Sequence, residues 1–192
     1  MTAVPLPPPL PAAARILDAG LALAVRGGAT AVSLQEVATH AGVSKGLIHY
    51  HFHDKATLVA RLVEHAAARV VAREREAAAR AAAAPAAQAL DVYWRWLETE
   101  LARGELRAGA ELAGDPAEHV RAAARHASGL RHGAAAATLD ALFGTLALRP
   151  RVPAPMLAAV LVSFVDGLAV SAAANRRVAY DVFWLAVLGL AE

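Results

Sequence analysis

A glycine and a serine, Gly42 and Ser44, interrupt an otherwise helical pattern between Ser33 and Lys55. Glycine tolerates the positive φ that a sharp helix exit needs, and serine is a preferred first cap of a helix. The residues on either side of this break therefore predict two short helices joined by a tight turn. Ser33 has Glu36 three residues on, which is the spacing of a capping box at the start of the first helix.

Both short helices have one apolar and one polar side. The apolar residues, which predict a shared core, are Val37, Ala38, Ala41, Leu47, Ile48 and Phe52. The other side of the second helix presents hydrogen-bond donors and a flat aromatic ring, from Lys45, Gly46, His49, Tyr50 and His51. This is the pattern of a helix-turn-helix, in which the second helix enters the major groove of DNA.

A third helix follows at once, with Asp54 as its expected cap and Lys55 in its first turn. A cation at this position opposes the helix dipole, so we attribute it to an external anion. The chain has 19 basic residues, and its two lysines are Lys45 and Lys55. One interpretation is chance within an arginine-rich composition; the other is that both lysines meet phosphate as point charges.

Residues 12–62 resemble the DNA-binding domain of the tetracycline-repressor (TetR) family of bacterial transcriptional regulators. The residues that carry the resemblance are Arg15, Ile16, Leu17, Ala19, Gly27, Gly28, 32–37, 41–46, Ile48, Phe52, Lys55 and Leu58. The chain departs from the family at His49, where most members carry a tyrosine that contacts a phosphate. A histidine donates to phosphate only from a protonated nitrogen. The rest of the chain is similar to the family in length and helical pattern.

The resemblance implies that this segment binds double-stranded operator DNA. We expect Lys45 to reach a guanine edge or a phosphate and Gln35 to reach adenine or the backbone. We expect Lys55 to bind a phosphate at the N-terminus of its helix. The other predicted DNA contacts are Ser33, Ser44, Gly46, Leu47, His49, Tyr50 and His51.

The apolar pattern is helical along the rest of the chain, so we predict an all-α protein. Prolines in residues 1–11 predict a disordered tail. Residues 12–58 are expected to form a three-helix DNA-binding domain, with the helix-turn-helix at 33–52. Residues 59–192 are expected to form a C-terminal helical domain that dimerises and binds a ligand. Its predicted helices, after a long one that runs from 54 to about 84, are 86–103, 108–112, 117–148, 156–174 and 178–190.

Composition limits the classes of protein that the chain can belong to. Hydrophobic residues make up 57 % of it and cysteine is absent, which excludes disulfides and cysteine-ligated metals. The apolar stretch 156–174 has about the minimum length of a membrane span, but it contains Asp166. We interpret this stretch as a helix buried by its own domain and by a partner subunit. No signal-peptide pattern is visible, so we expect a cytoplasmic protein with no membrane partner.

Two tryptophans suggest a ligand site in the C-terminal domain. Trp94 and Trp96 lie roughly 200° apart on a helix with 3.6 residues per turn, so they cannot share one face. One is expected in the core and the other at a cavity or an interface, unless both only pack. With His126 they form the predicted ligand pocket.

Other chemistry has little support. His49, His51 and His53 alternate along the chain, and helical residues two apart cannot bind one metal together. We therefore predict no metal site and no cofactor. Nucleophile elbows, phosphate loops, HExxH motifs and paired carboxylates are absent from the sequence, so we do not expect an enzyme.

These patterns favour a homodimeric repressor that binds a palindromic operator and is released by a small-molecule effector. The subunits are expected to pair through residues 117–148 and 156–174. Release by an effector is implied by the resemblance alone. Two alternatives stay open: a ligand-independent DNA-binding regulator, and a helical protein that binds a metal or small molecule and carries a vestigial helix-turn-helix.

Overall fold

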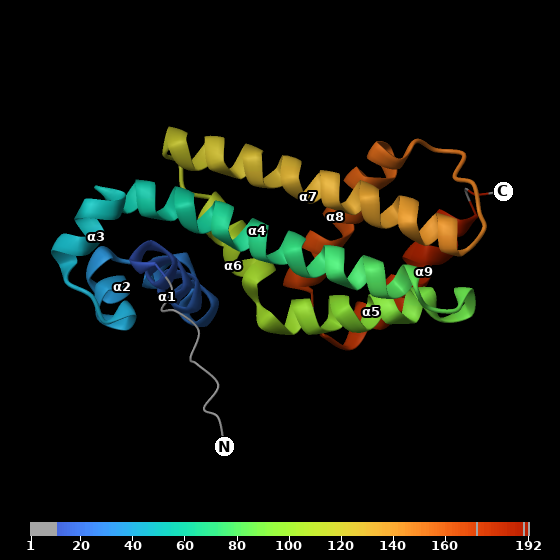
Figure 1. The fold of residues 1–192 in the computed structure, drawn as a ribbon, viewed down its shortest axis with the longest axis horizontal. Coiled ribbons are helices and arrows are strands. Elements are labelled where there is room, and N and C mark those ends of the chain that lie inside the picture. The colour runs from blue at the N-terminus through green and yellow to red at the C-terminus, as the bar shows by residue number, and fades with distance from the viewer. Residues whose placement is uncertain (1–10, 172, 190, 192) are drawn as a thin grey trace, which may run out of the picture.

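The computed structural model describes residues 11–171, 173–189 and 191, so the predicted tail, apart from Pro11, lies outside the described residues. The described residues form nine α-helices and two short 3-10 helices, which confirms the all-α prediction. In order they are α1 Ala12–Gly27, η1 Ala29–Ala31, α2 Leu34–Ala41, α3 Lys45–Phe52, α4 Lys55–Ala82, α5 Ala86–Arg103, α6 Glu105–Ala113, α7 Glu118–Thr145, α8 Ala154–Val170, η2 Ala173–Asn175 and α9 Arg176–Leu188. Figure 1 shows α1, α2 and α3 at one end of an elongated molecule.

The starts of α2, α3 and α4 are each fixed by a side-chain cap. In each case a side-chain oxygen accepts a hydrogen bond from a backbone N–H three residues on. The pairs are Ser33 and Glu36 at 3.1 Å, Ser44 and Leu47 at 3.2 Å, and Asp54 and Thr57 at 2.7 Å. Between α2 and α3, Gly42 has the left-handed conformation, with φ 64° and ψ 40°. The predicted helix-turn-helix is therefore present with the expected caps and turn.

The long helix α4 contributes to two separate apolar clusters. Its first half packs with α1, α2 and α3 and with parts of α6 and α7, around Ile16, Ile48, Phe52 and Leu62. Its second half packs with α5, α7, α8 and α9. The expected domain boundary at residues 58 and 59 thus falls inside one continuous helix, and α4 and α7 run side by side along the molecule (Figure 1).

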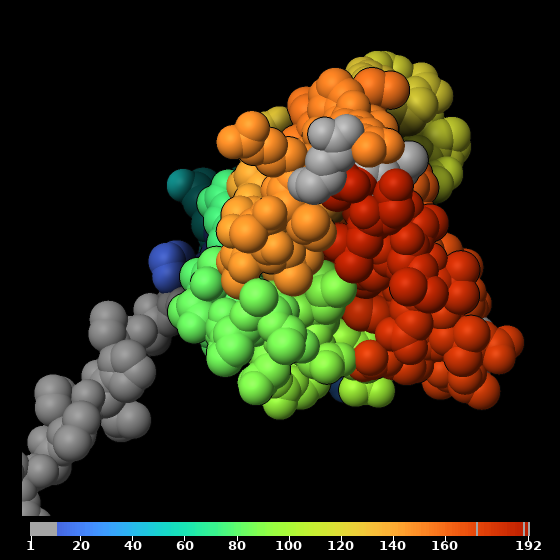
Figure 2. Space-filling model, turned by 90° about the vertical axis from the view of Figure 1, so that its right-hand side faces the viewer, coloured from blue at the N-terminus to red at the C-terminus, as the bar shows by residue number. Residues whose placement is uncertain are grey.

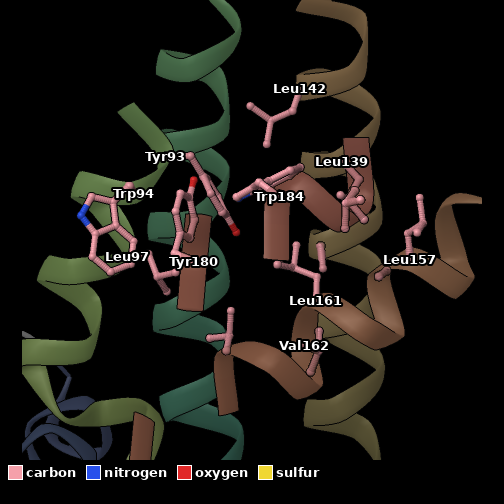
Figure 3. Packing of buried hydrophobic residues seen from close by; sticks show 14 of the residues in the cluster. Tyr93, Trp94, Leu97, Leu139, Leu142, Leu157, Leu161, Val162, Tyr180 and Trp184 are labelled. Atoms are coloured by element: carbon pink, nitrogen blue, oxygen red, sulfur yellow. The ribbon is translucent and has the colours of Figure 1, made fainter. Parts of the chain in front are cut away.

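The second cluster contains most of the few aromatic side chains. Figure 3 shows Trp94 of α5 beside Tyr180 of α9, and their ring centroids are 4.7 Å apart. The Tyr180 hydroxyl donates to the Leu90 carbonyl at 2.7 Å, which satisfies the polar end of a buried ring. Trp184 packs edge-on against the same tyrosine. These rings fix α9 against α5.

The apolar helix α8 differs from the prediction in its bounds. It ends at Val170, because Ser171 has an extended backbone and its hydroxyl donates to the Gly167 carbonyl at 2.7 Å. Met156, Val160 and Val170 are 62 %, 55 % and 74 % exposed, so the chain alone does not bury this helix on all sides. Within the part of the chain that the structure describes, no helix has both the length and the apolar character needed to cross a bilayer.

The contact between α1 and α4 provides a test of the packing. A Cβ atom placed on Gly20 would lie 2.9 Å from Cδ2 of Leu62, which is fully buried. We expect Gly20→Ala to lower the free energy of unfolding by about 1–3 kcal/mol, because an added methyl overpacks this contact. Urea unfolding followed by circular dichroism measures the change.

Gly129 on α7 is the matched control, since no atom would lie within 4 Å of its added Cβ. Gly129→Ala should raise the free energy of unfolding by about 0.5–1 kcal/mol through helix propensity alone. Equal effects of the two substitutions would contradict the close packing at Gly20.

Candidate nucleic-acid interface and a cavity in the helical bundle

The outer side of α3 is exposed. Ile48 and Phe52 are buried, whereas Lys45, Gly46, His49 and Tyr50 are exposed. Tyr50 is 76 % exposed, which is unusual for a large aromatic side chain. The cap at Ser44 and the buried pair fix α3 so that these four residues point away from the core.

The remaining predicted DNA contacts surround this surface. Gln35 in the first turn of α2 and Ser44 are exposed, and Ser33, Leu47 and His51 are half-buried. Ser33 and Ser44 use their oxygens to accept backbone bonds, so each O–H stays available as a donor.

Both lysines of the chain lie on this side of the molecule. Lys45 is the first residue of α3, Lys55 is the first residue of α4, and both are exposed. Among the described residues, neither has an ion-pair partner. Two cations thus stand at helix N-termini, where the backbone N–H groups also attract anions.

His49 has a structural contact that restricts its chemistry. Its Nδ1 lies 2.8 Å from the carbonyl oxygen of His53, the residue with φ 60° that ends α3. A carbonyl only accepts, so Nδ1 carries the proton in this contact. In the neutral ring Nε2 is then an acceptor, and it donates to a phosphate only when the ring is protonated.

The predicted pocket residues do not come together. Trp94 lies in the core against α9, while Trp96 is half-buried against Tyr93 and borders an open groove of about 570 Å³ between α4 and α5. His126 is exposed on α7. Because they lie two residues apart on α5, the tryptophans occupy opposite sides of the helix, as the spacing predicts.

A different cavity lies between α4, α6, α7 and α8. It has a volume of about 360 Å³, and valine and alanine side chains such as Val63, Ala110 and Val162 form most of its wall. Its charged residues are Glu105, Arg131 and Asp166, and Arg131 Nη1 lies 2.7 Å from Asp166 Oδ1. The sequence does not reveal this cavity, because its residues are scattered over four helices without a motif.

Glu105, on the α6 side of this cavity, forms ion pairs with two arginines of α4. Glu105 accepts hydrogen bonds from Arg69 at 3.1 Å and from Arg73 at 2.6 Å. Burial alone would raise the pKa of Glu105, but the bonds from Arg73 and Arg69 outweigh it and hold the pKa below its usual value. Glu105 is therefore ionised at neutral pH. Arg73 also pairs with Glu100, which is 1 % exposed.

A third buried carboxyl, Glu74, accepts from a different pair of groups. It accepts hydrogen bonds from the hydroxyl groups of Tyr93 at 3.0 Å and Thr138 at 3.2 Å. Burial raises the pKa of Glu74 above its ordinary value, although both hydrogen bonds lower it. Within the described residues, no group of three or more histidine, cysteine, aspartate or glutamate side chains is arranged to hold a metal ion.

The fold and the free surface of α3 define a helix-turn-helix DNA-binding protein. The family model described as bacterial regulatory proteins, tetR family, matches residues 16–62, so the N-terminal domain is a TetR-type DNA-binding domain. Taken together, this domain and the C-terminal helices have the fold of TetR-family transcriptional regulators. A search of curated proteins gave no match.

Solved structures resemble the chain over nearly its full length. A regulator from Mesorhizobium loti that is assigned to the TetR family has a TM-score of 0.72 at 18 % identity, over 94 % of this chain and 96 % of that one. NemR of E. coli, in its reduced form, has a TM-score of 0.74 at 18 % identity, over 95 % and 98 %. The multidrug-binding protein EbrR, complexed with imidazole, has a TM-score of 0.59 at 22 % identity, over 93 % and 96 %.

Glu74 makes stability depend on pH in a defined direction. Its pKa is raised on folding, so the native state holds this proton more tightly than the unfolded state does. Its contribution to stability is therefore present at low pH and is lost as pH rises above the ordinary carboxyl value, near 4.5. Compared with the unsubstituted chain, Glu74→Gln should therefore lower the free energy of unfolding less at pH 8 than at pH 5.

Chemical unfolding of both proteins across pH 5–8 measures this difference. Glu98→Gln, at an exposed position on α5, is the control. Its free energy of unfolding should differ from that of the unsubstituted chain by the same amount at every pH. A Glu74→Gln difference that stays constant with pH would contradict the raised pKa.

Proposed function

We propose that this protein is a homodimeric regulator that binds a palindromic operator with one α3 helix of each subunit in the major groove. The observation that carries the proposal is the exposed side of α3, where Lys45, His49 and Tyr50 have no role in the core, together with the exposed Lys55, which has no ion-pair partner among the described residues. Such a set combines phosphate contacts, which position a protein on DNA, with groups that read base edges.

The dimer is proposed to form through α8 and α9. Apart from Tyr50, the exposed large apolar side chains of the described residues all lie on these two helices: Met156, Val160, Val170, Val178, Val182 and Leu185. In Figure 2 the red residues of α9 and the end of α8 occupy one side of the molecule. A large exposed apolar patch marks an interaction surface.

This assignment revises the expected pairing through residues 117–148. The helix α7 packs along α4 on one side and against α8 on another, so much of its apolar surface is already covered. A two-fold axis through α8 and α9 leaves α3 free at the far end of each subunit. Such a dimer binds half-sites about 34–36 Å apart.

The cavity between α4, α6, α7 and α8 is proposed to bind the effector that releases the operator. It is mostly apolar and has a few charged groups, as is usual for small-molecule sites. Its wall includes α4, which also positions α3. Occupation that favours another α4 position would change the distance between the two α3 helices. The similar EbrR, which binds imidazole, supports a ligand-responsive regulator over a ligand-independent one.

Single substitutions separate the DNA contacts. Lys55→Ala should weaken binding to all sequences and reduce the salt slope by about two, because it removes one phosphate contact in each of the two half-sites. Lys45→Ala and Tyr50→Ala should also change sequence preference. Fluorescence anisotropy with the upstream intergenic DNA and with mutated half-sites, at several salt concentrations, measures both effects. Identical behaviour of the three variants would refute these roles.

The dimer has its own test. Leu185→Glu should convert the protein to a monomer, because it places a charge in the proposed apolar contact. Sedimentation equilibrium measures the mass, and operator affinity should fall at least tenfold. Arg121→Glu, at an exposed position of α7, is the control and should stay dimeric. A monomeric unsubstituted protein would refute the proposal.

A further inference from the structure

The cavity wall carries more negative than positive charge. Glu105 and Asp166 are carboxylates, and Arg131 is the guanidinium that faces them; Arg131 is already paired with Asp166 at 2.7 Å. Arg69 and Arg73 bind Glu105 from outside, since neither lines the cavity. An anionic ligand would therefore meet two carboxylates and a guanidinium that is already paired. A cationic ligand would meet carboxylates that are also paired but keep unused lone pairs, since Glu105 Oε1 accepts from Arg69 Nη2 and Asp166 Oδ1 lies beside Arg131 Nη1.

Glu105 is also the start of a chain of hydrogen bonds to the DNA-binding domain. Its Oε1 accepts from Arg69 Nη2 at 3.1 Å, and Arg69 Nη1 donates to Asp18 Oδ1 at 2.9 Å. Asp18 lies on α1, and its Oδ1 is also 2.9 Å from His65 Nε2. Three side chains thus connect the cavity on α6 with α4 and α1. A parallel bond from Arg107 to the Val25 carbonyl involves no residue of the cavity wall.

We infer that the cavity binds an apolar ligand with a positively charged group. Glu105 binds this charge, and the effect is transmitted through Arg69 to Asp18. The inference rests on the proposed function and adds to it the class of effector and the residues that transmit its presence. A ligand cation at Glu105 repels the Arg69 guanidinium and competes with it for the same carboxylate. Arg69 then moves relative to Asp18, which changes how α1 is held against α4.

The energetics suit such coupling. The Glu105 side chain is 11 % exposed and the Arg69 side chain is 38 % exposed, so water screens their interaction only from the Arg69 side. A ligand at one site typically changes the affinity of a second, coupled site by about 5- to 150-fold. We expect a cationic ligand to weaken operator binding at least tenfold, and operator DNA to weaken ligand binding by the same factor.

Three probes with the same carbon skeleton and different polar ends test the ligand class. They are 4-phenylbutylammonium, 4-phenylbutan-1-ol and 4-phenylbutyrate, titrated into the full chain at pH 7 by calorimetry. The ammonium should bind at least tenfold more tightly than the other two. Tighter binding of the butyrate, which Arg131 would attract, overturns the inference. So does tighter binding of the alcohol, or no binding of the ammonium at millimolar concentration.

Glu105→Gln tests the sensing residue. It should weaken ammonium binding about tenfold and leave alcohol binding within about threefold. Glu111→Gln is the matched control, because Glu111 lies on the same helix outside the cavity wall and should not change either probe. Unchanged ammonium binding in Glu105→Gln overturns the role of Glu105. The probe series on the unsubstituted chain decides the ligand class even where this variant folds poorly.

Asp18→Asn tests the transmission, since Asp18 lies outside the cavity. This variant should bind the ammonium within about twofold of the unsubstituted chain. The tenfold effect of the ammonium on operator affinity, measured by anisotropy, should fall to less than threefold. An equal ammonium effect in both proteins overturns the transmission. Failure of the proposed function is distinct, because the unsubstituted chain would then lack salt-dependent operator binding altogether.

Discussion

The shared helix α4 holds the two ends of the molecule in one arrangement. Its buried side chains run from Leu58 to Ala81, so the helix belongs to the core of the DNA-binding end and to the core of the C-terminal end. At about 1.5 Å per residue it extends roughly 40 Å. Phe52 and Ile48 fix α3 to the start of α4, and Lys55 is the first residue of α4. A displacement of α4 can therefore reach the surface that is proposed to bind DNA.

The middle of α4, where the two cores meet, is held by charges. Arg69 and Arg73 project towards α5 and α6, and Glu74 projects towards Tyr93 and Thr138. Buried charges are costly unless they are paired, and loss of one partner typically costs about 3–5 kcal/mol. Each of these groups has a partner, so the junction is stable as it stands. Because each charge depends on its partner, a new charge nearby disturbs the junction. An apolar junction would not respond in this way.

Local features of this fold could be predicted from the sequence, and relations between distant helices could not. The caps at Ser33, Ser44 and Asp54 and the turn at Gly42 depend on residues within four positions, and the structure has all of them. The bond from Arg69 to Asp18 joins residues 51 apart, and that from Arg69 to Glu105 joins residues 36 apart. Such pairs depend on the rotation and offset of whole helices, which periodicity does not specify. The end of α8 was also missed, because apolar character continues past Ser171 while the backbone turns.

The cavity follows from the composition in a way that no motif reveals. Alanine supplies much of the hydrophobic content, and small side chains let helices approach closely where they interlock. Where alanines of different helices face one another across the bundle, as Ala66, Ala110 and Ala127 do, they are too short to fill the space. A cavity therefore forms without any residue specialised to create it. Its chemistry comes from the few long polar side chains that reach the wall, and Glu105 differs from Asp166 in being tied to the DNA-binding end. In a chain this rich in alanine, selectivity for a ligand and transmission of its binding can thus depend on a single carboxylate.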